Sequence, residues 1–241
     1  MAGLVVVALA YSFTQTTEES GQNPPKETAV SNISPSYSIG SPDIPADLSF
    51  AGEKVPLSRG DVREKLDREM LVNTYWQSAT VLLLKRSKRI FEIIEPILKE
   101  NGVPEDFKYL AVAESALVEN AVSSSGARGI WQFIKATGKK YGLESSSTVE
   151  ERYHLEKATR AACVYLKNAY NETGSWALAA AAYNRGLHGI STALKDQNVS
   201  SYYDLFLNRE TGRYVYRILA IKTIMGDPAK YGFQVDDKEY Y

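Results

Sequence analysis

The chain is poor in the residues from which metal and redox sites are built. Its 241 residues include a single cysteine, Cys163, and two histidines, His154 and His188. One cysteine cannot form an intrachain disulfide, and two separated histidines make no cluster of metal ligands. We therefore expect no metal site and no cofactor. Cys163 lies in an apolar stretch and is predicted to be a small buried core residue.

The sequence also lacks a charge excess and a run long enough to span a membrane. The net charge is -1, so there is no basic surplus of the kind that nucleic-acid binding requires. A basic run at 85–89 is interpreted as the solvated face at the start of a helix. The apolar run at 4–10 is far shorter than the ~20 residues that cross a bilayer. It resembles the distal part of a secretory signal or anchor, although no Lys or Arg precedes Lys26. We favour a truncated or misassigned start over an accidental likeness.

Polar, low-complexity sequence follows this run as far as residue 47. It is rich in Ser, Thr, Pro and Asn and has no periodicity, which predicts a flexible tether. The expected organisation has four parts. These are a remnant of a signal or anchor at 1–13, a flexible linker at 14–50, N-terminal helices that pack on the catalytic domain at 51–100, and the main domain at 101–241.

The rest of the chain has no alternating strand pattern and no internal repeat, and it predicts an all-α fold. Gly174 and Ser175 mark the end of one helix and the N-cap of the next. Pro96 lies inside a helical pattern and predicts a kink or a break. Helices are expected at 62–84 (one or two), 86–101, 104–117, 130–141, 154–173, 176–183, 201–206 and 213–225, followed by an irregular tail from 231.

One acidic residue interrupts the apolar stripe of the helix expected at 104–117. A proline and two acids at 104–106 favour a helix start, because proline suits the first turn and acids suit the positive end of the helix dipole. Glu114 shares the spacing of three and four with the apolar residues, so it is predicted to face the core. A carboxyl group in apolar surroundings has a raised pKa and can deliver a proton near neutral pH. The stripe consists of Phe107, Leu110, Ala111 and Leu117.

No other acid is predicted to lie on such a stripe. Glu119 falls in a polar turn and is interpreted as solvated. Glu150 and Glu151 flank a helix start and are interpreted as charges that complement its dipole. A lone acid on an apolar face is as readily an ion-paired structural residue as a catalytic one. Glu114 alone leaves both interpretations open.

Two further stretches contain residues that could form a site together with Glu114. In the first, Gly126 and Gly129 permit a tight backbone path that brings hydroxyls, backbone N–H groups and Gln132 together beyond the acid. The alternative is an ordinary loop before a core helix. In the second, Tyr183 and Asn184 end a helix of small residues, where the tyrosine either borders a cleft or completes the core.

Taken together, these stretches resemble the ordered motifs of the lytic murein transglycosylases, in particular the membrane-bound D type. The resemblance covers roughly residues 87–226, and four separated motifs in the right order make it specific. The matching residues are Glu114-Ser115-Ala116; Ser123 with Gly126-Ala127-Arg128-Gly129; Trp131-Gln132-Phe133; Ala136-Thr137-Gly138; Tyr141-Gly142-Leu143; Ala182-Tyr183-Asn184 with Gly186; and Glu210-Thr211 with Tyr214-Val215.

The resemblance implies a goose-type lysozyme-like helical domain that acts on peptidoglycan glycan strands. The family cleaves the β-1,4 bond between N-acetylmuramic acid and N-acetylglucosamine and leaves a 1,6-anhydromuramoyl end. By motif position, Glu114 would be the single acid and base. The family also implies a place in the bacterial envelope, on the periplasmic side, with a membrane tether through the N-terminus; oligomeric state stays open. The residues implied to bind substrate or border the acid are Ser123, Gln132, Ile134, Tyr183, Asn184, Glu210 and Tyr214.

The role of Arg185, which departs from the family pattern, stays open, as do two alternative functions. Arg185 stands where the family usually has a small residue, and it either contacts an anionic lactyl or peptide carboxylate or points into solvent. A lysozyme-type muramidase, in which water attacks, is the first alternative function. It usually needs a second carboxylate, which the sequence does not make obvious. A non-catalytic peptidoglycan-binding module is the other, and the buried acid argues against it.

Overall fold

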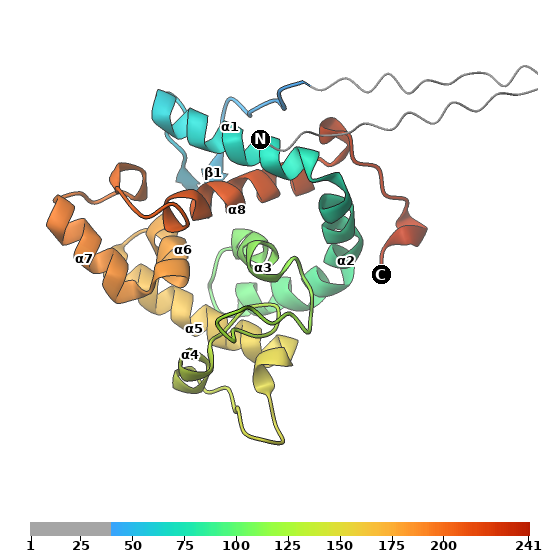
Figure 1. The fold of residues 1–241 in the computed structure, drawn as a ribbon, viewed down its shortest axis with the longest axis vertical. Helices are drawn as coiled ribbons and strands as arrows, with labels where there is room; N and C mark the ends of the chain where they lie inside the picture. Colours follow the sequence, from blue (N-terminus) through green and yellow to red (C-terminus); the bar gives the residue numbers. More distant parts are fainter. Residues whose placement is uncertain (1–39) are drawn as a thin grey trace, which may run out of the picture. The chain divides into compact units, whose positions relative to one another are not determined.

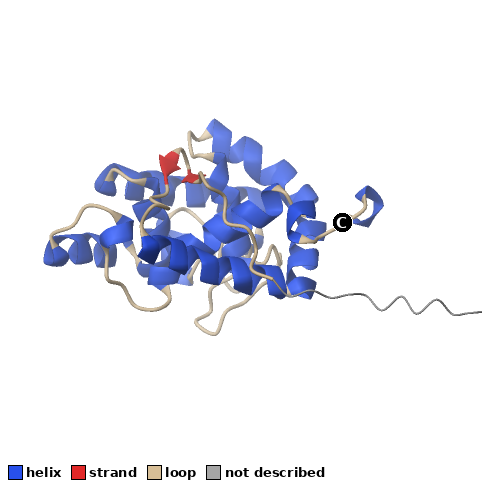
Figure 2. Cartoon of the chain, turned by 90° about the horizontal axis from the view of Figure 1, so that it is seen from above, coloured by secondary structure: helices blue, strands red, loops and turns tan. Residues whose placement is uncertain are grey.

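The computed structural model describes residues 40–241, which fold into a helical unit (Figure 1, Figure 2). The expected signal remnant and most of the expected linker lie outside these residues. The all-α expectation is confirmed for the part described. The α-helices are α1 Gly60–Tyr75, α2 Gln77–Glu100, α3 Lys108–Ser115, α4 Lys135–Lys140, α5 Leu155–Thr173, α6 Trp176–Arg185, α7 Leu187–Gln197 and α8 Thr211–Gly226. Single-turn 3₁₀ helices are η1 Glu105–Phe107, η2 Glu151–Tyr153, η3 Tyr202–Asp204, η4 Ala229–Tyr231 and η5 Asp237–Glu239.

The boundary between α5 and α6 follows the local signals in the sequence. Gly174 has a φ of 69° and ends α5 in the left-handed conformation that glycine adopts without a Cβ clash. The side chain of Ser175 accepts a hydrogen bond from the backbone N–H of Leu178 and so caps α6. Both predictions are confirmed.

Helix α2 differs from the sequence prediction. The expected break near residue 85 is absent, and one helix runs from Gln77 to Glu100 because a single buried stripe continues through Leu84, Ser87 and Ile90. Pro96 is accommodated near the end of this helix, where its missing N–H removes one backbone hydrogen bond. The basic run at 85–89 therefore lies in the middle of a helix and not at its start.

Two other helix expectations were wrong, and one helix was missed. The helix expected at 130–141 is reduced to α4, because residues 130–133 form turns around a positive φ at Gln132. The stretch 201–206 forms only the single turn η3. Helix α7 was not predicted, since Gly186 and Gly189 obscure its periodicity.

Helix α3 lies in the middle of the unit in Figure 1, and α8 contacts it as well as α1 and α6. Close approach to α6 is possible because residues 179–182 of that helix are four alanines, all fully buried. The core continues through Phe50, Phe107 and Trp176, whose rings meet edge to face. In Figure 1 α3, which carries the acid, is enclosed by longer helices.

A short hairpin braces the start of α6. Strands β1 Ser49–Phe50 and β2 Glu53–Lys54 are antiparallel, with Phe50 opposite Glu53. The Glu53 carboxylate accepts hydrogen bonds from the Ser175 hydroxyl (2.8 Å) and from the backbone N–H groups of Trp176 (2.5 Å) and Ala177 (3.1 Å). These contacts satisfy N–H groups that the first turn of a helix leaves unpaired, and they place a negative charge at its positive end.

Cys163 is buried, as the sequence predicts. Within residues 40–241 there is no cluster of three or more His, Cys, Asp or Glu residues that could hold a metal ion. The same part of the chain contains no helix of sufficient length and apolarity to cross a membrane.

Candidate active site

Glu114 lies in the last turn of α3. The helix is shorter than the sequence indicated, because Ala116 and Leu117 adopt φ values of 53° and 56°, which no α-helix continues. The chain turns away directly after the acid, while Leu117 folds back into the core. Glu114 thereby faces a hollow, although its neighbours Val112 and Ser115 are buried.

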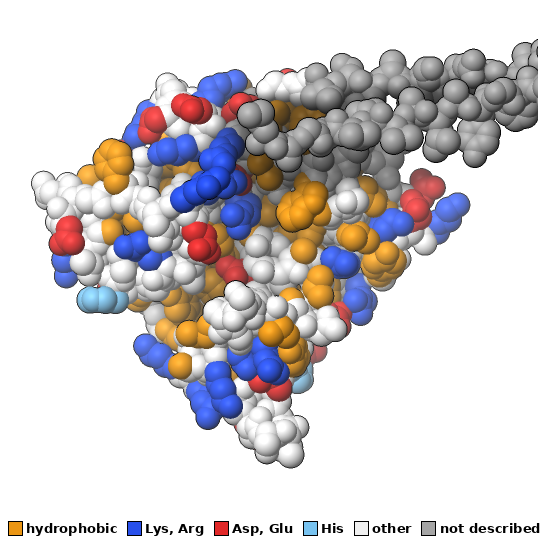
Figure 3. Space-filling model, in the orientation of Figure 1, with side chains coloured by type: hydrophobic (Ala, Val, Ile, Leu, Met, Phe, Trp, Pro, Cys, Tyr) orange, Lys and Arg blue, Asp and Glu red, His pale blue; other side chains and the backbone are white. Residues whose placement is uncertain are grey.

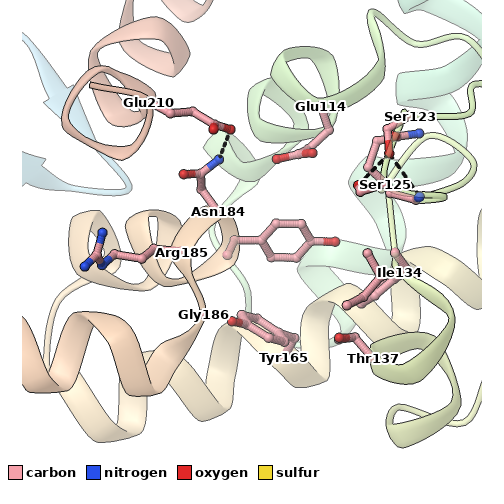
Figure 4. Close-up of a pocket in the computed structure, with 14 residues that line it drawn as sticks. Glu114, Ser123, Ser125, Ile134, Thr137, Tyr165, Asn184, Arg185, Gly186 and Glu210 are labelled. Carbon is pink, nitrogen blue, oxygen red and sulfur yellow. Dashed lines mark hydrogen bonds between the residues drawn. The ribbon is translucent and has the colours of Figure 1, made fainter. Parts of the chain in front are cut away.

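The hollow has a volume of about 480 Å³ and gathers residues from four separate motifs. In Figure 4 the side chains of Glu114 and Glu210 point toward the same space from opposite elements. Figure 3 shows acidic side chains meeting hydrophobic surfaces in a hollow near the middle of this face. The sequence-predicted residues that line it are Glu114, Ser123, Gln132, Ile134, Tyr183, Asn184 and Glu210. Tyr214 is buried behind the acid.

Burial dominates the electrostatics of Glu114. Loss of water raises the pKa of its carboxyl to about 7, because the charged form is poorly solvated. The hydroxyl of Tyr214 donates a hydrogen bond to Oε1 and lowers the pKa, as does the positive charge of Arg217. The negative charge of Glu210 raises it. The result is a carboxyl group that is partly protonated at neutral pH, which suits a group that gives and then takes a proton.

A second buried carboxylate, from α1, pairs with two arginines of α8. Glu69 on α1 is 1% exposed, and its Oε1 accepts a hydrogen bond of 2.5 Å from Arg213 Nε. Its Oε2 lies 4.0 Å from Arg217 Nε and has no hydrogen-bond partner within residues 40–241. The expectation that Glu114 is the only acid on an apolar stripe was therefore wrong. Glu69 follows Val62 and Leu66 on the buried face of α1 and is the ion-paired structural case.

The loop between α3 and α4 is held against η2 by backbone contact. Gly129 has a φ of 75°, and a Cβ there would lie 2.0 Å from the carbonyl oxygen of Arg152. The buried guanidinium of Arg152 donates to the carbonyl oxygens of Gly126 and Phe133, both at 3.0 Å. Its ion pair with Glu150 holds the pKa of that carboxyl near 2. Glu150 is thus a structural partner of Arg152 and not the helix-dipole charge expected from the sequence.

This loop presents Ser123, Gln132 and Ile134 to the hollow. The Ser123 hydroxyl contacts that of Ser125 at 2.9 Å and accepts a hydrogen bond from Ala127 N (3.0 Å), as drawn in Figure 4. The Gln132 amide nitrogen donates to the Gly129 carbonyl (2.7 Å), so the side chain is fixed. Ile134, at the N-cap of α4, leaves 46% of its surface exposed.

The end of α6 forms the opposite wall. The Tyr183 hydroxyl donates to the Trp131 carbonyl at 2.8 Å, and burial raises the pKa of this phenol well above its ordinary value. Asn184 links two elements: its amide donates to Glu210 (3.0 Å), and its oxygen accepts from the Thr211 hydroxyl (2.8 Å). Both alternatives left open for Tyr183 apply, since its ring also packs against other aromatic rings while lining the hollow.

A second hollow of about 570 Å³ lies on the other side of the acid, against α1, α2 and α8. It shares Glu114, Ser123 and Gln132 with the first. Its rim carries the indole of Trp76, which is 66% exposed. The carboxyl of Glu114 therefore borders both hollows, as a group acting in the middle of an extended ligand would.

Sequence reasoning missed several of these groups. Glu69 carried the same signal as Glu114, an acid at core spacing, and could have been found. Trp76 was counted among the apolar residues of the helices expected at 62–84 and so was expected to pack on the core, whereas it lies exposed between α1 and α2. Arg152 and Arg217 gave no local signal, because their partners come from distant elements.

Known proteins match this chain at the level of a domain. The family described as Transglycosylase SLT domain matches residues 91–206. Proteins from two strains of Escherichia coli, both described as membrane-bound lytic murein transglycosylase D, are 28% identical over 195 residues. The match covers 78% of this chain and 42% of each relative, so the chain spans less than half of their length. An X-ray structure of an inactive mutant of lytic transglycosylase Slt from Pseudomonas aeruginosa is 24% identical with a TM-score of 0.47, over 62% of this chain and 26% of that one.

Proposed function

We propose that the chain is a peptidoglycan lytic transglycosylase in which Glu114 is the catalytic acid and base. The match of residues 91–206 to the family described as Transglycosylase SLT domain supports this proposal. The protein cleaves the β-1,4 bond between N-acetylmuramic acid and N-acetylglucosamine and leaves a 1,6-anhydromuramoyl end. The observation that carries this proposal is a desolvated carboxyl with a pKa of about 7 that borders two hollows at once.

In the first step, protonated Glu114 gives its proton to the glycosidic oxygen as the bond from that oxygen to C1 of the muramoyl sugar breaks. The leaving N-acetylglucosamine carries the proton away as a hydroxyl group, and C1 of the muramoyl sugar keeps a positive charge, shared with its ring oxygen, until the second step. The carboxylate that remains is stabilised by the hydrogen bond from Tyr214 and by the positive charge of Arg217. These two groups offset the cost of a charge in a desolvated position.

In the second step, the Glu114 carboxylate takes the proton of the C6 hydroxyl while that oxygen closes on C1. The acid is restored, no water is consumed, and the product is an internal 1,6-anhydro ring. One carboxyl performs both steps because the substrate supplies the nucleophile, as in other reactions where substrate atoms replace a second carboxylate. Neither step calls for a cofactor.

The other predicted residues hold the sugars in this proposal. Ser123 and Gln132 border both hollows, so they contact the sugar units on either side of the scissile bond. Ile134 and Tyr183 offer apolar surface to sugar rings, while Asn184 and Glu210 offer polar atoms. Tyr214 does not contact the sugars; it donates a hydrogen bond to Glu114 and lowers its pKa. The partner is a peptidoglycan strand, and the protein acts in the bacterial envelope, on the periplasmic side, with a membrane tether through its N-terminus.

A lysozyme-type muramidase is the second candidate, and Glu210 favours it. This second carboxylate lines the same hollow as Glu114, and in Figure 4 both point toward one space. In that case Glu210 would assist the attack of water on C1, and the product would be a reducing end. The hydrogen bond from Asn184 already engages one oxygen of Glu210, which weighs against a free base there.

Product analysis tests the proposal. Purified sacculi are digested with the wild-type protein and with Glu114→Gln, and the soluble fragments are identified by mass spectrometry. We expect anhydromuramoyl ends from the wild type and none from the variant, with both proteins folded by circular dichroism. Reducing ends, which are heavier by one water, would replace the proposal with the muramidase. Full activity of the variant would remove Glu114 from either mechanism.

A further inference from the structure

A third hollow adjoins the candidate active site at the far end of α6. It has a volume of about 290 Å³ and lies between α7 and the loop before α8. Arg185 lines both this outer hollow and the hollow in front of Glu114, so the two hollows adjoin at this residue. The lining includes Arg185, His188, Asp196, Gln197, Phe206 and Asn208.

Phe206 projects from the rim of the outer hollow with 89% of its surface exposed. A single exposed apolar side chain is by itself common on a protein surface. The backbone of this residue, however, is held on both sides by one glutamine: Gln197 Nε2 donates to the Phe206 carbonyl (3.0 Å), and Gln197 Oε1 accepts from the Phe206 N–H (2.8 Å). The ring therefore extends into solvent from a fixed position in an otherwise irregular loop.

Arg185 supplies a free positive charge beside this ring. Its side chain lies along α7 over Gly189, where a Cβ would come within 3.2 Å of Arg185 Cγ and 3.3 Å of its Nε. In Figure 4 it points away from Glu114. Among the described residues 40–241, no ion pair or hydrogen bond involves the guanidinium, although Asp196 also lines the hollow. A guanidinium in this state can bind a carboxylate through two parallel hydrogen bonds.

We propose that the outer hollow is a distal binding site for an N-acetylmuramoyl unit of the strand that is cleaved at Glu114. The apolar face of the pyranose ring stacks on Phe206, and the carboxylate of its lactyl group or stem peptide binds Arg185. This inference rests on the proposed function and deepens it. An uncharged hexosamine would contact Phe206 but not Arg185. The two side chains together therefore favour muramoyl over glucosaminyl units.

Chain length is the first readout of this site, because only a long strand reaches from Glu114 to Phe206. The KM of the wild type should fall as the glycan lengthens from four sugars to eight. In Phe206→Ala this dependence should be lost, with the KM for the longer glycan raised about tenfold, the effect of uncovering part of an aromatic face. Gln197→Ala keeps the ring and frees its backbone, so it should produce a smaller rise. Val164→Ala, an equally conservative change at an exposed position on α5, serves as the control.

The second test asks whether the site recognises the charge of the ligand. Binding affinity is measured with every variant also carrying Glu114→Gln, so that the ligand is not cleaved. Arg185→Ala should weaken an eight-sugar muramoyl glycan about tenfold and leave an eight-sugar chito-oligosaccharide, which has no carboxylate, unchanged. Phe206→Ala should weaken both ligands. Equal affinity of all variants for both ligands would overturn the distal site while anhydro products from the wild type would still support the proposed function. Absence of those products would overturn the function itself.

Discussion

The hydroxyl of Tyr214 on α8 donates a hydrogen bond to Oε1 of Glu114 on α3, although 100 residues separate them in the chain. This bond lowers the pKa of a carboxyl that burial raises. Replacing Tyr214 by Phe should therefore raise the pKa of Glu114 further. The alkaline limb of kcat/KM, which follows loss of the proton from Glu114, should move upward from about pH 7 by about one unit. The rate at neutral pH should fall about tenfold, since the carboxylate loses the donor that orients it.

Tyr216 offers a matched control on the same helix. It is fully buried, and its hydroxyl has no hydrogen-bond partner within residues 40–241. Tyr216→Phe should leave the pH profile unchanged and keep or slightly raise the free energy of unfolding, because an unpaired buried hydroxyl is removed. An identical shift of the alkaline limb in both variants would contradict the role assigned to Tyr214.

Glu114→Gln should have a pH-dependent effect on stability. The pKa of Glu114 is raised from 4.5 in the unfolded chain to about 7 in the folded protein, so folding favours the protonated form. The stability that this gives is complete below pH 4.5 and is lost as pH rises through about 7. The glutamine never ionises. The variant should match the wild type at about pH 4 and exceed it at about pH 8.5 by up to about 3 kcal/mol in urea unfolding. A difference that is the same at both pH values would show that Glu114 is not desolvated.

Gly129→Ala should prevent the site loop from closing. The added Cβ would lie 2.0 Å from the Arg152 carbonyl oxygen, so the backbone has to move. We expect a loss of about 3 kcal/mol or more in the free energy of unfolding, together with loss of activity. Gly126→Ala is the control, because Gly126 also has a positive φ, 77°, but no atom lies within 4 Å of the place that its Cβ would take. That variant should lose only about 1 kcal/mol in the free energy of unfolding, the cost of a positive φ alone. Thermal unfolding of both variants therefore separates the steric clash at position 129 from the backbone strain that both share.

Glu150→Gln should leave the buried guanidinium of Arg152 without its charged partner. The side chain of Glu150 is partly exposed, and solvent screens the pair, so we expect a loss of about 1 to 2 kcal/mol at pH 7. The pKa of Glu150 is lowered to about 2, so its contribution is present above pH 4.5 and disappears as pH falls through about 2. Urea unfolding from pH 7 to pH 2 should therefore show the two proteins converging. Glu119→Gln, which breaks the exposed pair with Arg89, should change stability little at any pH.

Glu69 and Glu114 both lie at core spacing on their helices, on α1 and α3. Spacing alone found Glu114, and the same rule applied to α1 would have found Glu69. Periodicity cannot say which of them is paired as a structural residue, because the answer depends on the side chains that each acid contacts across the fold. Glu69 is paired with Arg213 and borders only the second hollow, whereas Glu114 accepts a hydrogen bond from Tyr214 and borders both hollows.

The sequence by itself determined the helical class, the caps between α5 and α6, the position of an acid at core spacing, and the ordered motifs that the family described as Transglycosylase SLT domain matches over residues 91–206. These are properties of neighbouring residues, governed by local backbone preferences and by spacing along one helix. Only the tertiary structure decided the pKa of Glu114, the contact between Arg152 and Gly129, and the placement of Arg185 over Gly189. Desolvation and close backbone approach arise between segments far apart in the chain, and no local pattern records them.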